Sequence, residues 1–411
     1  MKRSVFFLIS VMFLALAGPT PSLADTELTG EKDGAFFRIV VPDNWNGELV
    51  IWAHGFSLSP IADVPDLGPL AALQLAEGYA VAASSYSQIG WALFRTRRDH
   101  NNLIRIFKEN FGKPKQILMN GGSLGGIVTA QALELASADI AGAYPICGAV
   151  AGSRVWDGGL DVRLIYDYVC GDVPGAAIPG GPEGLPVDSD LTEIEMALAV
   201  NQCTGVLAPP EFRTPEQAAR LEEILTTTTL PESFLLIVMG FSTFSLSDLT
   251  HDPGKLKGYI GVGNAQVVYP DPDIDAGIER VSPVPAARND LLRHFTPHGN
   301  VGGAKIVSLH TDKDGLVIVE NETEYANVVP ESQLTTAIVV EDSPTHCGFT
   351  EAEAVAGWEA MRAWVAGFPK PSAADIQGAC QLLELAGLAS GPCRIDPTFE
   401  LQDLDTRIPP R

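Results

Sequence analysis

The sequence has few basic residues, and this shortage excludes several classes of protein. It contains 27 lysines and arginines against 51 aspartates and glutamates, which gives a formal net charge of −24. Such an acidic surface repels phosphate backbones and anionic lipid headgroups. We therefore expect no nucleic-acid partner and no electrostatic docking to membranes. Acidity itself is typical of the solubilising exterior of an exported protein and indicates no particular substrate.

Motifs for metals and nucleotides are missing as well. No two of the six cysteines are spaced as CxxC, so zinc-ligand spacing is absent. The glycine-rich run at residues 120–126 fits neither the GxxxxGK[ST] nor the GxGxxG phosphate-binding pattern. Three alternating aspartates at 271–275 are followed by Ala276 and Ser282, where a calcium loop requires glycine and glutamate. We interpret them as an acidic loop and expect neither a cofactor nor a metal.

Only the first residues hold a long, pure apolar run. A basic start at residues 2–3 precedes the run Val5–Ala17, and small residues lead up to Ala24. This pattern predicts a secretory signal peptide over residues 1–24, cleaved after Ala24. The run is too short to span a bilayer comfortably, and the first cysteine, Cys147, is far from the cleavage site. We therefore predict a secreted or periplasmic protein without a membrane anchor.

The six cysteines are an even number, which suits disulfides in an exported chain. Two cysteines lie close together in a short C-terminal tail, and two lie in one central segment. The sequence leaves many pairings open; proximity favours Cys170–Cys203 and Cys380–Cys393, and Cys147–Cys347 is then the third pair.

Segments typical of strands and helices alternate along much of the chain. The expected strands are 35–41, 48–53, 78–86, 115–120, 140–148, 304–311 and 333–341. The expected helices between and after them are 97–112, 124–136, 320–329 and 350–368. This rhythm predicts an α/β fold with a mostly parallel sheet flanked by helices.

The rhythm breaks in the middle of the chain. We predict a core made of residues 25–149 and 304–368, interrupted by a largely helical cap or lid insertion at 150–303. Residues 369–411 form a tail that the last cysteine pair is expected to staple. In the cap, the apolar run Phe234–Phe241 either lines an acyl or aromatic pocket or packs the cap onto the core.

A serine stands among glycines in the run NGGSLGG, between a predicted strand and a predicted helix. The residues Gly121–Gly125 have the Gly-x-Ser-x-Gly spacing of a nucleophile elbow, a sharp turn that lifts Ser123 above the sheet edge. At the helix start, the N–H of Leu124 is placed to stabilise an oxyanion. A glycine-rich turn at this point can also be purely structural, so the motif needs partners.

The partners of an activated serine are a base and an acid, which follow it in the order acid, then histidine. His346 lies in a loop after a late strand and is the histidine with the right order. The acid is expected just after the strand 304–311, where we favour Asp314 and keep Asp312 as the alternative. Two aspartates there are also typical of turn capping. The N–H of Phe56, after the strand 48–53, is the second expected oxyanion donor.

These segments together resemble an exported bacterial member of the α/β-hydrolase superfamily. The resemblance is carried by HGF at 54–56, GGSLG at 121–125, HTDKDGLV at 310–317 and HCGFTEAE at 346–353. It implies the α/β-hydrolase fold and a Ser123–Asp314–His346 triad that acts without a cofactor. It further implies a carboxylic-ester hydrolase for small, aromatic or oligomeric esters. A serine peptidase or amidase, or a binding protein without turnover, stays open, and the oligomeric state is not indicated.

Overall fold

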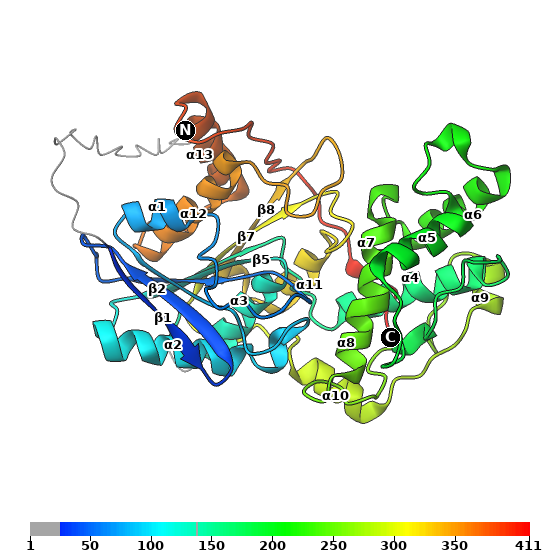
Figure 1. Ribbon diagram of the computed structural model, residues 1–411. Coiled ribbons are helices and arrows are strands. Elements are labelled where there is room, and N and C mark those ends of the chain that lie inside the picture. The colour runs from blue at the N-terminus through cyan, green and yellow to red at the C-terminus, as the bar shows by residue number, and fades with distance from the viewer. Residues whose placement is uncertain (1–24, 137–138) are drawn as a thin grey trace.

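Strands of five to seven residues, mostly apolar apart from β1, build one eight-stranded sheet in the order β1-β2-β4-β3-β5-β6-β7-β8 (Figure 1). The computed structural model describes residues 25–136 and 139–411, so the predicted signal peptide lies outside the described residues. The strands are β1 (Thr26–Lys32), β2 (Ala35–Val41), β3 (Leu49–Ala53), β4 (Ala80–Ser84), β5 (Ile117–Gly122), β6 (Gly142–Ile146), β7 (Lys305–Thr311) and β8 (Leu334–Val339).

The parallel part of the sheet consists of β4, β3, β5, β6, β7 and β8, and the carboxyl ends of these strands meet at one edge. In the register, Ala53 of β3 is paired with Gly121 of β5, and Thr311 of β7 with Val339 of β8. Strands β1 and β2 form an antiparallel hairpin at the other side, attached to β4. In open parallel sheets, ligands bind at the carboxyl edge, so this edge is where a site is expected.

Helices cover both faces of the sheet, as Figure 1 shows. One face carries α2 (Thr96–Phe111) and α3 (Leu124–Leu135), and the other carries α1 (Ala71–Ala76), α12 (Glu351–Val365) and α13 (Ala373–Leu385). The helix α11 (Asn321–Val328) connects β7 to β8. Because parallel strands are buried on both faces, they are apolar throughout: every residue of β3 is buried.

The cap lies to one side of the sheet (Figure 1). Its helices are α4 (Arg154–Cys170), α5 (Glu193–Thr204), α6 (Pro215–Thr228), α7 (Leu235–Gly240), α8 (Leu246–His251), α9 (Pro272–Gly277) and α10 (Pro285–Arg293). A π-helical turn, Phe241–Ser245, joins α7 to α8, and the continuous helix Glu232–His251 is long and apolar enough to cross a membrane. More than half of its most apolar window is buried, which is typical of a core helix.

The sheet order and its flanking helices confirm the predicted α/β-hydrolase fold. Every predicted strand is present, within a few residues of its expected bounds. The strand and α-helices that the sequence patterns did not indicate are β1, α1, α4, α8, α9, α10 and α13.

All three predicted disulfides are present, with Cα–Cα distances of 5.4 to 5.8 Å. Cys170–Cys203 joins α4 to α5 within the cap, and Cys380–Cys393 closes the tail around α13. Three disulfides fit folding in an oxidising compartment, outside the cell or in the periplasm.

Candidate active site

Ser123 occupies a sharp turn between β5 and α3 at the carboxyl edge of the sheet. Its backbone angles are φ +57° and ψ −122°, a region that non-glycine residues rarely adopt. The serine N–H donates to the carbonyl of Ile146 in β6 at 3.0 Å, which holds the turn against the neighbouring strand. A strained strand-to-helix turn of this kind exposes the serine Oγ above the sheet.

Of the glycines around Ser123, close backbone packing requires Gly121 and Gly125 but not Gly122. A Cβ on Gly121 would lie 2.3 Å from the Gly125 carbonyl oxygen, and one on Gly125 would lie 1.9 Å from the carbonyl oxygen of Ala53 in β3. Both approaches are too close for any side chain, so helix and strands pack backbone to backbone here. At Gly122, by contrast, the nearest atom would be 3.6 Å away on Trp52, which is an ordinary contact.

The structure brings the three residues of the predicted triad together. The Oγ of Ser123 lies 2.9 Å from Nε2 of His346, and Nδ1 of His346 lies 2.6 Å from Oδ2 of Asp314. The Asp314 side chain is fully buried, while that of His346 is 20% exposed. An acid, a histidine and a serine in this chain of hydrogen bonds have the geometry by which a hydroxyl is deprotonated.

Asp314, rather than Asp312, faces the histidine. The free oxygen of Asp314, Oδ1, accepts hydrogen bonds from the N–H groups of Leu316 and Val317, which fixes its carboxylate plane. Asp312 instead accepts from the N–H of Glu341, just beyond β8, so it ties the ends of two strands together. Of the two aspartates left open by the sequence, one therefore reaches the site and the other closes a turn.

The two predicted oxyanion donors border the serine. Leu124 is the first residue of α3, where N–H groups have no acceptor within the helix and the helix dipole is positive. Phe56 belongs to the loop after β3, which lines the same cleft as Ser123. A Cβ on the preceding residue, Gly55, would lie 3.6 Å from the Ser123 Cβ, so this loop passes directly beside Ser123.

His54, in the same HGF segment, is a structural residue. Its ring stacks on Tyr86 with centroids 4.0 Å apart, and Nδ1 is 2.8 Å from the carbonyl oxygen of Gly55. Burial lowers the pKa of His54, although hydrogen bonds with backbone groups oppose the change. The ring therefore packs against the loop after β3 that carries Phe56.

A disulfide braces the loop that carries His346. Cys347 follows the histidine directly and is bonded to Cys147, just beyond the end of β6 and 200 residues away in sequence. The N–H of Cys147 donates to the carbonyl of Leu309 in β7 at 2.7 Å. The histidine loop is thus fastened covalently to the centre of the sheet.

An open cleft of about 990 Å³ leads to the serine. One side comes from the core, including the loop after β3, and the other comes from cap helices α5 and α7 with the π-helical turn. The cap side chains in its lining are Glu193, Met196, Ala197, Leu236, Ile237, Phe241, Phe244 and Ser245. Glu193 is the only charged side chain among the described cleft residues outside the predicted triad.

The apolar run Phe234–Phe241 contributes both to the cleft and to the buried interior of the cap. Leu236, Ile237 and Phe241 line the cleft, whereas Leu235 and Met239 are fully buried in the cap. Met196 and Ala197 of α5 also line the cleft, and no sequence pattern had marked them. The tertiary packing of the cap turns this side of α5 toward the cleft. The sequence does not show how α5 is oriented, so it could not identify the two residues as part of the cleft.

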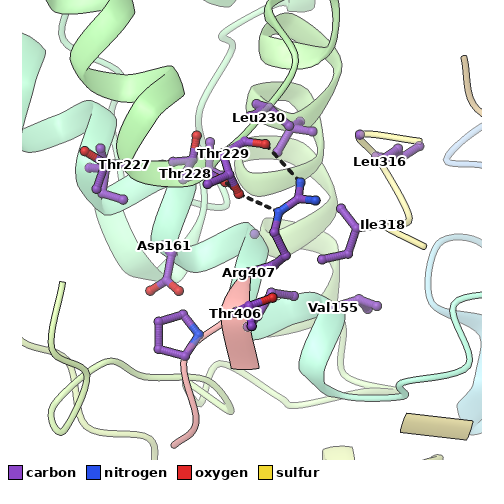
Figure 2. Close-up of a pocket in the computed structure, with 18 of the residues that line it drawn as sticks. Val155, Asp161, Thr227, Thr228, Thr229, Leu230, Leu316, Ile318, Thr406 and Arg407 are labelled. Atoms are coloured by element: carbon purple, nitrogen blue, oxygen red, sulfur yellow. Dashed lines mark hydrogen bonds between the residues drawn. The ribbon is translucent and has the colours of Figure 1, made fainter. Parts of the chain in front are cut away.

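A second, smaller pocket of about 130 Å³ lies behind the cleft, between the cap and the C-terminal tail (Figure 2). Arg407 of the tail donates to the carbonyl of Thr229 at 2.9 Å across this pocket. Phe241 and Leu316 line both the pocket and the cleft. The predicted triad lies outside this pocket. The pocket lies where the C-terminal tail packs against the cap.

The alternating aspartates serve as local structure. Asp271 caps the short helix α9 by accepting from the N–H groups of Asp273 and Ile274. Asp275 pairs with Arg280 at 2.7 Å. The prediction of a loop over 271–275 is wrong for most of this segment, because Pro272–Gly277 form the helix α9 that Asp271 caps.

No protein-family model matches the sequence, and a search of curated proteins finds no match. Solved structures with a related fold include feruloyl esterase B from Aspergillus oryzae, 15% identical, covering 84% of this chain and 80% of its own, with a TM-score of 0.44. A second esterase from Aspergillus oryzae is 17% identical over the same shares, at 0.42. An esterase from Rhodococcus sp. is 15% identical, covers 84% and 99%, and scores 0.38. These likenesses concern the fold and indicate no substrate for this chain, which has the α/β-hydrolase fold.

Proposed function

We propose that the protein is a secreted or periplasmic serine hydrolase that cleaves carboxylic esters through an acyl-enzyme on Ser123. The observation that carries this proposal is the continuous chain from Ser123 Oγ to His346 at 2.9 Å and from His346 to Asp314 at 2.6 Å. In a hydrolase fold, this arrangement at the carboxyl edge suits acyl transfer.

In the proposed reaction, Ser123 Oγ attacks the ester carbonyl while Nε2 of His346 takes the serine proton. Asp314 holds the imidazole in the required tautomer and stabilises its cationic form. The N–H groups of Leu124 and Phe56 stabilise the oxyanion, an effect of about 3 kcal/mol for each donor. His346 then protonates the leaving alcohol, and water repeats the cycle on the acyl-enzyme.

The cleft favours neutral, apolar esters, which include the small, aromatic and oligomeric classes. Its volume of about 990 Å³ leaves room for a group on each side of the scissile bond, and Trp52, Phe56 and Phe244 supply aromatic surface. Glu193 at the cleft, together with the acidic protein, repels anionic substrates. We expect no cofactor, no metal, no nucleic acid and no membrane anchor.

The test is hydrolysis of p-nitrophenyl esters from acetate to palmitate, beside matched p-nitroanilides, by the mature protein and its Ser123→Ala variant. We expect ester turnover in the wild type, loss of at least about 10⁴-fold in the variant, and little anilide cleavage. Faster anilide cleavage would instead establish an amidase or peptidase. Equal rates for wild type and variant would exclude Ser123 as the nucleophile.

A further inference from the structure

A second histidine lies directly behind the acid of the predicted triad. His310, in β7, is fully buried, and its Nε2 is 3.8 Å from Oδ2 of Asp314, the oxygen that contacts His346. The same Nε2 is 2.8 Å from the carbonyl oxygen of Val317. The N–H of Val317 in turn donates to Oδ1 of Asp314, so His310 closes a ring of contacts around the acid loop.

The other ring nitrogen of His310 contacts a buried carboxyl group. Nδ1 is 3.0 Å from Oε1 of Glu322 in α11, and the hydroxyl of Ser308 donates to the same oxygen at 2.8 Å. Glu322 is itself fully buried. Because a carbonyl and a carboxylate can only accept hydrogen bonds, His310 satisfies both partners only when both of its nitrogens carry protons.

The other ionisable groups near this pair support a charged histidine. Tyr325 of α11 is buried nearby, and the charges of Glu134 and Glu322 act with burial to raise its pKa, so it stays neutral. Burial alone would lower the pKa of His310, but its hydrogen bond with Glu322 and the charges of Glu322 and Asp314 outweigh burial and raise it. The described residues around His310 thus supply two carboxylates and no competing cation.

We propose that His310, held as an imidazolium by Glu322, is a positioning residue for the Asp314 carboxylate. Resting on the proposed function, this inference gives the site a second acid–histidine pair behind the first. His310 clamps the loop Asp314–Val317 through the Val317 carbonyl, and its charge, 3.8 Å from Oδ2 of Asp314, attracts that carboxyl group.

The charge of His310 has a predictable effect on the reacting histidine. A positive charge next to Asp314 opposes the protonation of His346, and the more distant Glu322 offsets only part of this effect. Removing the charge of His310 should therefore raise the pKa of His346. On the acid side of the pH profile, kcat/KM falls as His346 becomes protonated. This acid limb should move to higher pH by about 0.5 unit.

The first test is the variant His310→Gln, whose side-chain amide retains a donor for Val317 and carries no charge. We expect the acid limb to rise by about 0.5 unit with KM almost unchanged. The matched control is His100→Gln, because His100 is another fully buried histidine, bonded to the Thr96 carbonyl and remote from Asp314 in the fold. The control limb should stay in place. An unmoved limb in a folded His310→Gln protein would overturn the inference.

A second measurement holds even where His310→Gln fails to fold. Side-chain ¹⁵N NMR on the Ser123→Ala protein should show both ring nitrogens of His310 protonated at pH 7, and a single protonated nitrogen would contradict the proposal. This readout needs no turnover. Activity that survives in Ser123→Ala would overturn the proposed function, whereas a neutral His310 would overturn the second pair alone.

Discussion

In the sheet, strands β3 and β4 bury every residue and contain no charged side chain, whereas the cap buries its charges in pairs. Arg163 of α4 is fully buried and bonds Asp167 together with backbone carbonyls. Lys255 is also fully buried; it pairs with Asp248 and reaches across to the carbonyl of Ile89 in the core. Strands β3 and β4 are therefore held by apolar packing, whereas the cap also depends on fixed polar contacts.

Because of this difference, substitutions in the core and in the cap should have different effects on activity and stability. The core carries Ser123, His346 and Asp314 in one chain of hydrogen bonds, so changes there should affect every substrate. The cap supplies the cleft wall, so exposed changes there should alter the choice among substrates. Removing one member of a buried cap ion pair should mainly lower the free energy of unfolding, because it leaves a buried charge unpaired.

The largest expected effect compares the two aspartates after β7. Asp314→Asn should lower kcat by about 10⁴-fold, since an amide favours the wrong histidine tautomer. Asp312→Asn keeps an acceptor for the Glu341 N–H and should change kcat by no more than about threefold. Steady-state kinetics on one p-nitrophenyl ester measures both. Equal losses in the two variants would mean that Asp314 has no special role.

The next effect tests the close packing at the serine turn. Gly125→Ala places a methyl group 1.9 Å from the Ala53 carbonyl oxygen and should lower the free energy of unfolding by about 3 kcal/mol or more, or prevent folding. Gly122→Ala meets nothing closer than 3.6 Å and should cost less than about 1 kcal/mol. Urea denaturation followed by circular dichroism compares the two. Similar losses would show that the turn tolerates displacement.

A cap change should act on selectivity. Ile237 lines the cleft and is 50% exposed, so Ile237→Asn should lower kcat/KM for long-chain esters by about tenfold through lost apolar contact. The acetate ester, too short to reach it, should be hydrolysed at the wild-type rate. Val187→Asn is the control, since Val187 is exposed and outside the cleft. An equal loss of kcat/KM for every chain length would mean that Ile237 affects the reaction itself rather than the choice among substrates.

The smallest effect concerns an acid of the core. Burial, then repulsion from Glu359, raises the pKa of Glu77 to about 7, although Arg362 opposes the shift. The folded protein therefore binds more protons than the unfolded chain between pH 4.5 and 7, and its free energy of unfolding falls as pH rises through this window. Glu77→Gln should add about 1 kcal/mol at pH 8 and nothing at pH 4, after allowance for partial exposure.

Urea denaturation at both pH values tests this prediction. Glu109→Gln, in an exposed pair with Arg105, is the control and should show no such pH dependence. A gain for Glu77→Gln that is the same at pH 4 and pH 8 would mean that the carboxyl does not titrate differently on folding.

Sequence patterns predicted the elements whose apolar residues in the sequence are also the residues buried in the structure. Buried strands appear as apolar runs, and α12 begins at a capping box formed by Thr350 and Glu353. The strand β1 is polar and exposed at the sheet edge, so it has no apolar run that would predict it. The Asp33–Gly34 turn that joins it to β2 is the one hairpin signal there. In α4, an internal Gly158–Gly159 pair weakens the helical pattern, and tertiary packing overrides it.

The predicted site residues depend on chain order, which a sequence shows directly. Ser123, Asp314 and His346 follow one another as the fold requires, and the structure brings them within hydrogen-bonding distance. The choice between Asp312 and Asp314 depends on which way a turn closes, which no spacing rule decides. The pairing of His310 with Glu322 was not visible either, because it joins a strand to the following helix across a buried contact.

The most direct test of the central claim is the intact mass of the mature protein after treatment with a fluorophosphonate probe. An activated serine attacks phosphorus and keeps the phosphonyl group, whereas an ordinary serine does not react. We predict one adduct on the wild type and none on Ser123→Ala. An unlabelled wild type, or an adduct that persists in the variant, would contradict the proposal that Ser123 is the nucleophile.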